Sequence, residues 1–343
     1  MAMSKLNEKP VIWRLAKDLG IKKVSNPVED ILKFCEKRIK QILKEFPDCN
    51  TLQELLNIVA AKLHTEFCEI YNDPDLEGIK FRFVNRGEKI FANLETELND
   101  EVLGITFKRR NREPWEHEFA SVIDCRGSKS FRSYFTKWHE IAHLLVLTDQ
   151  QRLKFMRTNL EASNVDPEET MVDIIAGRFG FYPPFIQKKT QDRDLTFGRI
   201  DEMRAELCPA SSIQAALIGF VKAWPEPCIL AYCELGLKES EKKALFAQKS
   251  FDFLSGPIPS LRATKITLNR SATESSFRIH RNMRVPTSSV IHALYDGYEE
   301  FAEAEENLSS WESSGGKKLN DIPIIIRAKR YRDGVFALIS PTG

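Results

Sequence analysis

The chain carries the run His139-Glu140-Ile141-Ala142-His143 inside a segment, residues 131–147, that is expected to be helical. Positions four apart lie one turn apart on the same face of a helix, so the two imidazoles can point at a single metal ion. Apolar residues surround them on nearly every side of the segment, which predicts a buried helix. In a buried helix the two imidazoles and the carboxylate need polar partners, and a metal ion would provide one. The fold is therefore expected to enclose this helix around a metal centre.

The alternative is that both histidines are core residues, packed by neighbours such as Trp138 and Leu144. With only six histidines in 343 residues, chance would produce this motif in roughly one such chain in a hundred. We therefore favour the metal site. Glu140 would project beside the ion, where it can take a proton from a bound water.

A second predicted helix offers a third ligand. Asp166 followed by Pro167 is typical of a helix start. Glu169 and Asp173 lie on one face of that helix, so we expect Glu169 to be the third ligand and Asp173 to accept the free N–H of a ligating imidazole. Glu168 is the alternative ligand if the helix starts one residue away. Acidic residues in a first turn also complement the helix dipole without any metal.

The segment from Tyr134 to Leu145 resembles the ImmA/IrrE family of bacterial metallopeptidases, in which Phe-Thr shortly precedes H-E-x-x-H-L-L. Further along, that family has a Glu ahead of an Asn-x-Phe-Ala segment that ends in Pro. The counterparts here are Glu169, residues 173–176 and residues 181–183, and a serine-capped helix near residue 212 resembles the next feature. The resemblance covers residues 50–235. Three positions depart from the pattern: Ala142 replaces Gly, Asp173 replaces Asn and Tyr134 replaces an Arg.

The resemblance implies a gluzincin-like zinc endopeptidase with one Zn²⁺ per chain, held by His139, His143 and Glu169, with Glu140 as the general base. Members cleave a DNA-binding repressor in response to stress, DNA damage or phage infection. Because the sequence has no convincing helix-turn-helix of its own, the expected substrate is a separate helix-turn-helix repressor. The alternative is a regulator that binds the repressor without cutting it. The residue that stabilises the oxyanion is open, with Tyr134, Tyr182 and His117 as unranked candidates.

The predicted fold class is α+β, in three parts. Residues 1–50 form an N-terminal helical segment, 51–245 a mainly helical, zincin-like metallopeptidase domain with a small sheet, and 250–343 an α+β module of the sensor type. The formal charge of +1 excludes a strongly basic nucleic-acid coat. The sequence lacks an apolar run long enough to span a membrane, and its start has no signal-peptide core. An odd set of seven cysteines suggests reduced thiols, so the cytoplasm is expected.

Several local elements are predicted from periodicity. Strands are expected at 78–84, 104–107, 119–124 and 264–270, helices at 288–294 and 299–311, and a hairpin between 322 and 339 that turns at Arg332-Asp333-Gly334. Cys125 follows one of these strands. Its thiolate could occupy an open metal position and keep the enzyme latent, although a cysteine there is more simply a small buried residue.

Charge is segregated in the C-terminal module. Two basic clusters could align into a groove that binds single-stranded DNA through phosphate contacts and stacking. The residues concerned are Arg278, Arg281, Arg284, Arg327, Lys329 and Arg330, with Tyr331 among them. In the alternative, these basic segments pair with the acidic segment 296–312 and leave the module internally neutral.

Overall fold

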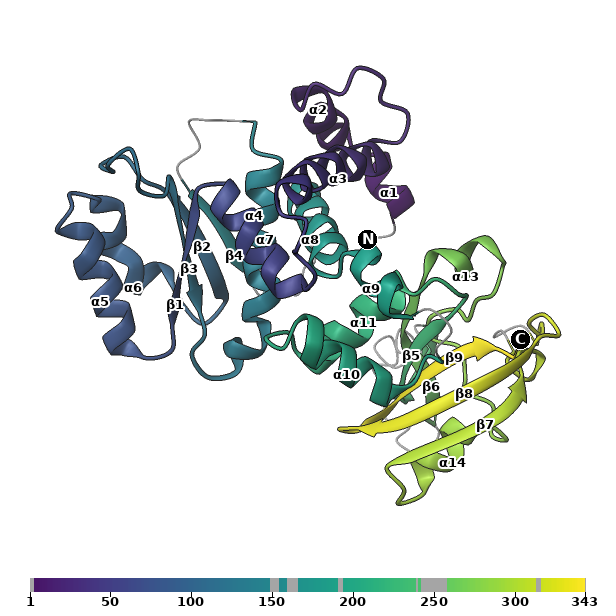
Figure 1. The fold of residues 1–343 in the computed structure, drawn as a ribbon. Coiled ribbons are helices and arrows are strands. Elements are labelled where there is room, and N and C mark those ends of the chain that lie inside the picture. Colours follow the sequence, from purple (N-terminus) through teal and green to yellow (C-terminus); the bar gives the residue numbers. More distant parts are fainter. Residues whose placement is uncertain are drawn as a thin grey trace. The chain divides into compact units, whose positions relative to one another are not determined.

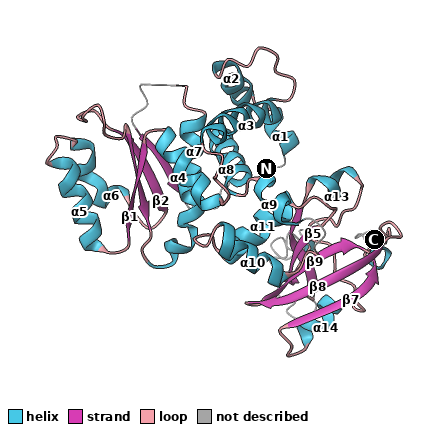
Figure 2. Ribbon diagram, in the orientation of Figure 1, coloured by secondary structure: helices cyan, strands magenta, loops and turns pink. Residues whose placement is uncertain are grey.

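The computed structural model describes residues 3–148, 154–158, 166–190, 194–238, 240–241, 258–312 and 316–342 (Figure 1). The chain forms two compact units. The first comprises residues 1–185 and 204–215, and the second comprises 186–203 and 216–343. Each has its own sheet, so the α+β class is confirmed (Figure 2). None of the described helices is both long and apolar enough to cross a membrane.

The first unit opens with helices α1 (Met3–Asn7), α2 (Pro10–Asp18), α3 (Pro27–Glu45) and α4 (Leu52–Lys62). The side chain of Asn26 caps α3 by accepting from the backbone N–H of Glu29. Thr51 and Glu54 form a capping box at the start of α4. The predicted helical character of residues 1–50 is confirmed. Helix α3 is tied to the rest of the unit because Arg38 Nη1 donates to the carbonyl of Leu145 at 2.5 Å.

A four-stranded sheet follows, in the order β1-β3-β2-β4. Its strands are β1 (Thr65–Ile70), β2 (Val102–Lys108), β3 (Phe119–Asp124) and β4 (Lys154–Thr158). Strands β1 and β3 are parallel, whereas β2 pairs antiparallel with both β3 and β4. Strands β2 and β3 were predicted and are confirmed. Strand β4 was not predicted, and it forms the edge of the sheet beside β2.

Alternate residues of β2 face the two sides of this sheet. Ile105 and Phe107 pack with α5 (Asp73–Val84), η1 (Lys89–Asn93) and α6 (Leu94–Glu97). On the other side, Gly104 and Thr106 face α7 (Ser133–Leu145), which follows the short helix η2 (Gly127–Arg132). Figure 1 shows α5 and α6 on one side of the sheet and α7 on the other. The central strand thus presents its smallest and most polar residues to the motif helix.

The strand predicted at 78–84 is wrong, because these residues belong to helix α5. Asn72 and Asp75 form a capping box, and Pro74 lies in the first turn, so the local start signal is strong. The apparent alternation of residues 78–84 is overridden by this start and by burial of Leu76 and Phe83 against the sheet.

Helix α8 (Pro167–Gly180) packs along α7. The approach is close at Gly180, where an added Cβ would lie 3.1 Å from the Trp138 ring. The carbonyl of Gly180 accepts a hydrogen bond from the Tyr134 hydroxyl at 2.6 Å. The predicted start of α8 is confirmed, since the Asp166 side chain accepts from the N–H of Glu168. Helices α9 (Pro183–Thr190), α10 (Phe197–Leu207) and α11 (Ile213–Ala223) follow along the chain, and their residues are divided between the two units.

The second unit contains a five-stranded antiparallel sheet in the order β6-β5-β9-β8-β7. Its strands are β5 (Ile229–Gly236), β6 (Ser260–Leu268), β7 (Phe301–Asn307), β8 (Pro323–Tyr331) and β9 (Gly334–Pro341). Helices α13 (Arg270–Glu274) and α14 (Val290–Asp296) and the turn η3 (Leu308–Ser310) supply residues to a core that includes Phe277 and Trp311. The predicted strand at 264–270, the helix near 288–294 and the β8–β9 hairpin are confirmed.

Two expectations about this region need correction. The helix predicted at 299–311 is wrong, because residues 301–307 form strand β7 and pair with β8. Alanine and glutamate favour helices, but cross-strand pairing with β8 overrides that preference. The boundary predicted between 245 and 250 also differs from the observed division, since β5 pairs with β6 and β9 and belongs to the second unit. The charged segment 237–243 is expected from its sequence to be a linker or boundary helix, and its residues 239, 242 and 243 lie outside the described residues.

Candidate metal centre

Three side chains from α7 and α8 converge in the first unit. His139 Nε2 and His143 Nε2 are 3.2 Å apart. Glu169 Oε2 lies 3.2 Å from the first of these nitrogens and 3.5 Å from the second. Both imidazoles are buried, whereas 32 % of the Glu169 side chain is exposed. Within the described part of the chain, this is the group of His, Cys, Asp and Glu side chains arranged to hold a metal ion.

The distances allow a test of whether a metal fits. Four ligands in a tetrahedron, each about 2.0–2.1 Å from the ion, are separated from one another by about 3.3–3.4 Å. The three observed separations of 3.2, 3.2 and 3.5 Å match the edges of such a tetrahedron. Two imidazoles and one carboxylate are also the donor set of a zinc site that leaves its fourth position open. The group therefore fits a tetrahedral divalent ion without rearrangement.

Asp173 fixes the tautomer of His139. Its Oδ1 lies 2.9 Å from His139 Nδ1. A carboxylate only accepts hydrogen bonds, so Nδ1 carries the proton and the lone pair of Nε2 points into the group. The structure thus brings together the four residues that the sequence suggested for the ligands and their support. Glu168 is not among them, because its carboxylate lies 3.9 Å from Arg14.

Ionisation of the group follows from these contacts. Burial alone would raise the pKa of Glu169, but the hydrogen bonds to His139 and His143 outweigh burial and hold that pKa far below its usual range. Burial alone would lower the pKa of His139, yet its contacts with Asp173 and Glu169 raise it. In the metal-free protein the carboxylate is therefore charged, and protons compete for the imidazole that a metal would need neutral.

Glu140 lies beside this group without belonging to it. Its side chain is fully buried, and Oε2 accepts a hydrogen bond of 2.7 Å from the Thr106 hydroxyl. Because Thr106 donates to Glu140, the Ser121 hydroxyl, 2.6 Å away, must donate to Thr106. Oε1 has no hydrogen-bond partner among the described residues. Two buried hydroxyls thus orient a carboxylate that keeps one oxygen free to exchange a proton.

Sequence reasoning missed one charged residue at this centre, Arg157 of β4. Its Nη1 donates to the Thr136 hydroxyl at 2.9 Å, and its guanidinium lies 4.6 Å from the centre of the Phe135 ring. Burial lowers the pKa of Arg157, while the charges of Asp173, Glu140 and Glu169 act in the opposite direction. The alternation from Lys154 to Thr158 was the sole sequence signal for the strand that carries it.

A cavity of about 280 Å³ opens next to His143. Its apolar lining comes from α2, the end of α7, β4 and α8, and its charged lining includes Arg14, Asp18 and Glu168. The apolar residues are Leu15, Val146, Leu147, Phe155 and Val172. A side chain bound there would lie beside His143, one of the three candidate ligands.

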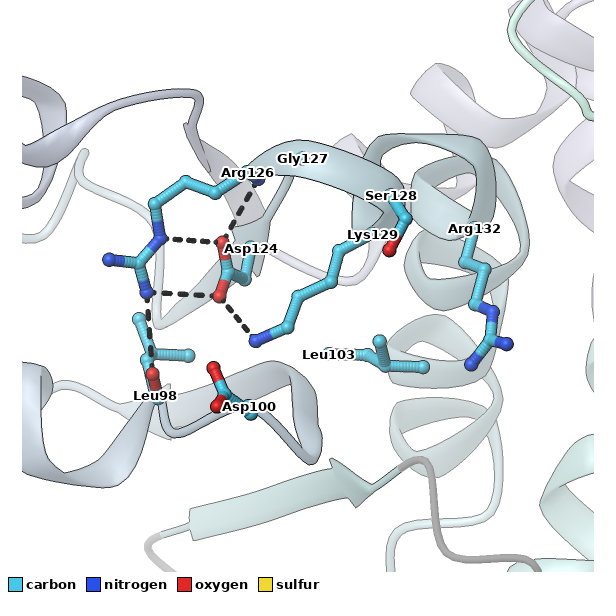
Figure 3. Close-up of a pocket in the computed structure, with 9 residues that line it drawn as sticks. All are labelled: Leu98, Asp100, Leu103, Asp124, Arg126, Gly127, Ser128, Lys129 and Arg132. Atoms are coloured by element: carbon cyan, nitrogen blue, oxygen red, sulfur yellow. Dashed lines mark hydrogen bonds and ion pairs between the residues drawn. The ribbon is translucent and has the colours of Figure 1, made fainter.

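A larger cavity of about 600 Å³ lies by η2, at the end of β3 (Figure 3). Figure 3 shows the Asp124 carboxylate between Arg126, which donates from Nε at 2.9 Å, and Lys129, which donates at 2.7 Å. Burial would raise the pKa of Asp124, but these hydrogen bonds outweigh it and lower that pKa. The charges of the cavity are therefore largely paired internally, and Asp124 ties η2 to the sheet.

Cys125 is not brought to the metal group. Its buried thiol lies 3.9 Å from the Glu69 carboxylate. Burial, reinforced by the charge of Glu69, raises the pKa of Cys125 to about 11, so the thiolate needed for a latent zinc ligand is disfavoured. All seven cysteines are free thiols. The structure therefore gives the cysteine switch no support.

The predicted candidates for stabilising an oxyanion are poorly placed. Tyr134 is buried, and its hydroxyl is used by the carbonyl of Gly180. Tyr182 is also buried, and burial raises its pKa to about 12. His117 is exposed in the β2–β3 loop, where its carbonyl accepts from Arg109.

The six basic residues proposed for DNA binding separate into two sets. Arg278, Arg281 and Arg284 are exposed. The three on β8 have partners within the second unit. Arg327 pairs with Glu303 at 2.9 Å and with Asp194 at 3.3 Å. Lys329 lies 3.9 Å from Asp201, and Arg330 donates to the carbonyls of Gly297 and Glu299. The alternative of internal pairing therefore describes β8, through Glu303 of β7, through Asp194 and Asp201, and through backbone carbonyls.

Comparison of the chain with models of known protein families finds no matching family, and a search among curated proteins finds no similar sequence.

Proposed function

We propose that the protein is a zinc-dependent endopeptidase with a zincin-like catalytic unit, related in its motif helix to the ImmA/IrrE metallopeptidases. The observation that carries the proposal is the tetrahedral spacing of His139, His143 and Glu169 beside a buried Glu140 with one free oxygen. A zinc ion bound by the three ligands would polarise the scissile carbonyl and make water nucleophilic at neutral pH.

The remaining chemistry falls to Glu140. Its free Oε1 takes a proton as the water oxygen bonds to the carbonyl carbon, and it then delivers that proton to the amide nitrogen. The C–N bond breaks, leaving a carboxylic acid and an amine. The hydrogen bond from Thr106 to Oε2 fixes the orientation of the carboxylate and leaves Oε1 available for this proton transfer.

Peptide binding is supported by two neighbouring features. Strand β4 is the edge strand beside α7, and an extended peptide can add to such an edge through main-chain hydrogen bonds. The cavity next to His143, lined by both apolar and charged residues, would accept a substrate side chain near the scissile bond. We propose a helix-turn-helix repressor as the substrate and the cytoplasm as the compartment, the latter supported by the seven free thiols.

The test is a comparison of new protein N-termini in cells that express the wild type or the Glu140→Gln variant. A peptidase produces N-termini that depend on the intact glutamate, and the proposed substrate is a DNA-binding repressor. If both forms give the same N-termini and the same transcriptional response, the protein acts by binding alone. Single-stranded DNA is not part of the proposal, because the β8 residues it required are paired internally.

A further inference from the structure

Arg157 projects from the edge strand towards the turn of α7 that precedes Glu140, where it contacts Phe135 and Thr136. It lies directly opposite Gly104 in the β2–β4 register. A Cβ at Gly104 would lie 2.7 Å from Thr136 Cγ2 and 3.3 Å from Glu140 Oε1, so this face of the strand pair looks onto α7. Residues opposite each other on two strands share a face. The missing side chain of Gly104 therefore leaves β2 close to Thr136, the α7 residue to which Arg157 donates a hydrogen bond.

Two contacts hold the guanidinium in place. Thr136 Oγ1 donates to the carbonyl of Arg132 at 3.0 Å, so its lone pair is available to accept from Arg157 Nη1 at 2.9 Å. The Phe135 ring supports the guanidinium from one side at 4.6 Å. A guanidinium has five N–H donors. Among the described residues, Arg157 donates a hydrogen bond to Thr136 alone. Arg157 is thus fixed in orientation while donors remain for a ligand.

The positive charge of Arg157 offsets the net negative charge of the centre. Glu140, Glu169 and Asp173 all act on its guanidinium, yet none of them approaches it within 4.0 Å as an ion pair. Three carboxylates and a divalent ion leave a net charge of −1, which the guanidinium cancels. An oxyanion that forms at this centre would otherwise add negative charge to a site that is already negative.

From these observations, and resting on the proposed peptidase function, we infer that Arg157 is a catalytic residue that donates a hydrogen bond to the scissile carbonyl oxygen as that oxygen gains negative charge. Arg157 then takes the role for which Tyr134, Tyr182 and His117 were considered. The edge strand that would bind the peptide also carries the group that stabilises its transition state.

The test uses the zinc-loaded full chain and two probes measured by calorimetry. A phosphinic leucyl-leucine dipeptide carries a tetrahedral anion at the reacting position, whereas mercaptoacetyl-leucine binds zinc through sulfur and has no oxyanion there. The variants are Arg157→Gln, Arg157→Lys and, as a matched control, Arg112→Gln in the β2–β3 loop. Zinc content and melting temperature are recorded for each.

We expect Arg157→Gln to weaken binding of the phosphinic dipeptide at least tenfold and binding of the thiol less than threefold, with zinc retained. Arg157→Lys should recover part of the loss, and Arg112→Gln should match the wild type. Removing one such donor commonly lowers turnover by about 10²–10³-fold. Equal weakening of both probes, or loss of zinc, would show that Arg157 only supports the fold and overturn the inference. A wild type that binds zinc but neither probe would instead overturn the peptidase proposal itself.

Discussion

The hydrogen bond between Asp173 and His139 gives the most quantitative expectation for the metal centre. In the variant Asp173→Asn, the amide can present its NH₂ to Nδ1 and so favour the wrong tautomer, or accept more weakly through its oxygen. Either way, the lone pair on Nε2 becomes less available. We therefore expect the variant to fold normally and to bind zinc more weakly.

The size of the loss follows from the geometry. Hydrogen bonds to charged groups contribute about 1.5–3 kcal/mol. The 2.9 Å contact is short, but 52 % of the Asp173 side chain is exposed to solvent, which favours the lower end of that range. A loss of about 1.5 kcal/mol corresponds to roughly a tenfold weaker affinity.

The assay is a competition titration between the protein and a chromophoric zinc chelator at pH 7.5. Glu168→Gln is the matched control, because it removes a neighbouring charge of the same helix that lies outside the ligand group. We expect wild-type affinity in Glu168→Gln, about tenfold weaker binding in Asp173→Asn and severe loss in Glu169→Gln. Unchanged affinity in Asp173→Asn, or a loss in Glu168→Gln as large as in Glu169→Gln, would refute this account of the ligands.

Three further expectations concern the surroundings of the centre. Thr106→Val should lower turnover by about 10–100-fold with zinc retained, because the Glu140 carboxylate loses its orienting donor; unchanged kinetics would contradict this. Asp124→Asn should lower the free energy of unfolding, measured in urea, by about 2 kcal/mol. This is less than the loss on breaking a fully buried ion pair, because Lys129 is partly exposed. Since the pKa of Asp124 is lowered, its contribution is present above pH ~3.9 and is lost below it, so the variant's deficit should vanish in acid. Because the pKa of His139 is raised, protons should begin to compete with zinc above about pH 6.5, so that zinc affinity falls as the pH drops. A zinc affinity, measured by equilibrium dialysis, that stays constant between pH 8 and 6 would contradict this.

Sequence patterns predicted the motif helix and its partner because their signals are local. The spacing of His139 and His143 needs only one helical turn, and Asp166-Pro167 marks the start of α8 within two residues. The distance of Glu169 from the motif could not be derived from spacing alone. It depends on the close packing of α7 on α8, which Gly180 permits at Trp138.

The features that were missed depend on contacts between distant segments. Thr106 reaches Glu140 across 34 positions of the chain, and Arg157 reaches Thr136 across 21. Strand β4 is five residues long and is defined by its pairing with β2, so periodicity gave it little weight. The alanines and glutamates of β7 favour a helix, and the pairing of this segment with β8 makes it a strand instead.

The most direct test of the metal centre is zinc K-edge X-ray absorption on the purified, zinc-loaded chain. We expect one zinc per chain, with imidazole nitrogen and carboxylate oxygen at about 2.0–2.1 Å and no sulfur. The His143→Ala and Glu169→Ala variants should lose the ion, whereas Glu140→Gln should keep it. A sulfur neighbour at about 2.3 Å would reinstate a cysteine ligand. Failure of the zinc-supplemented wild type to hold an ion would contradict the proposed centre altogether.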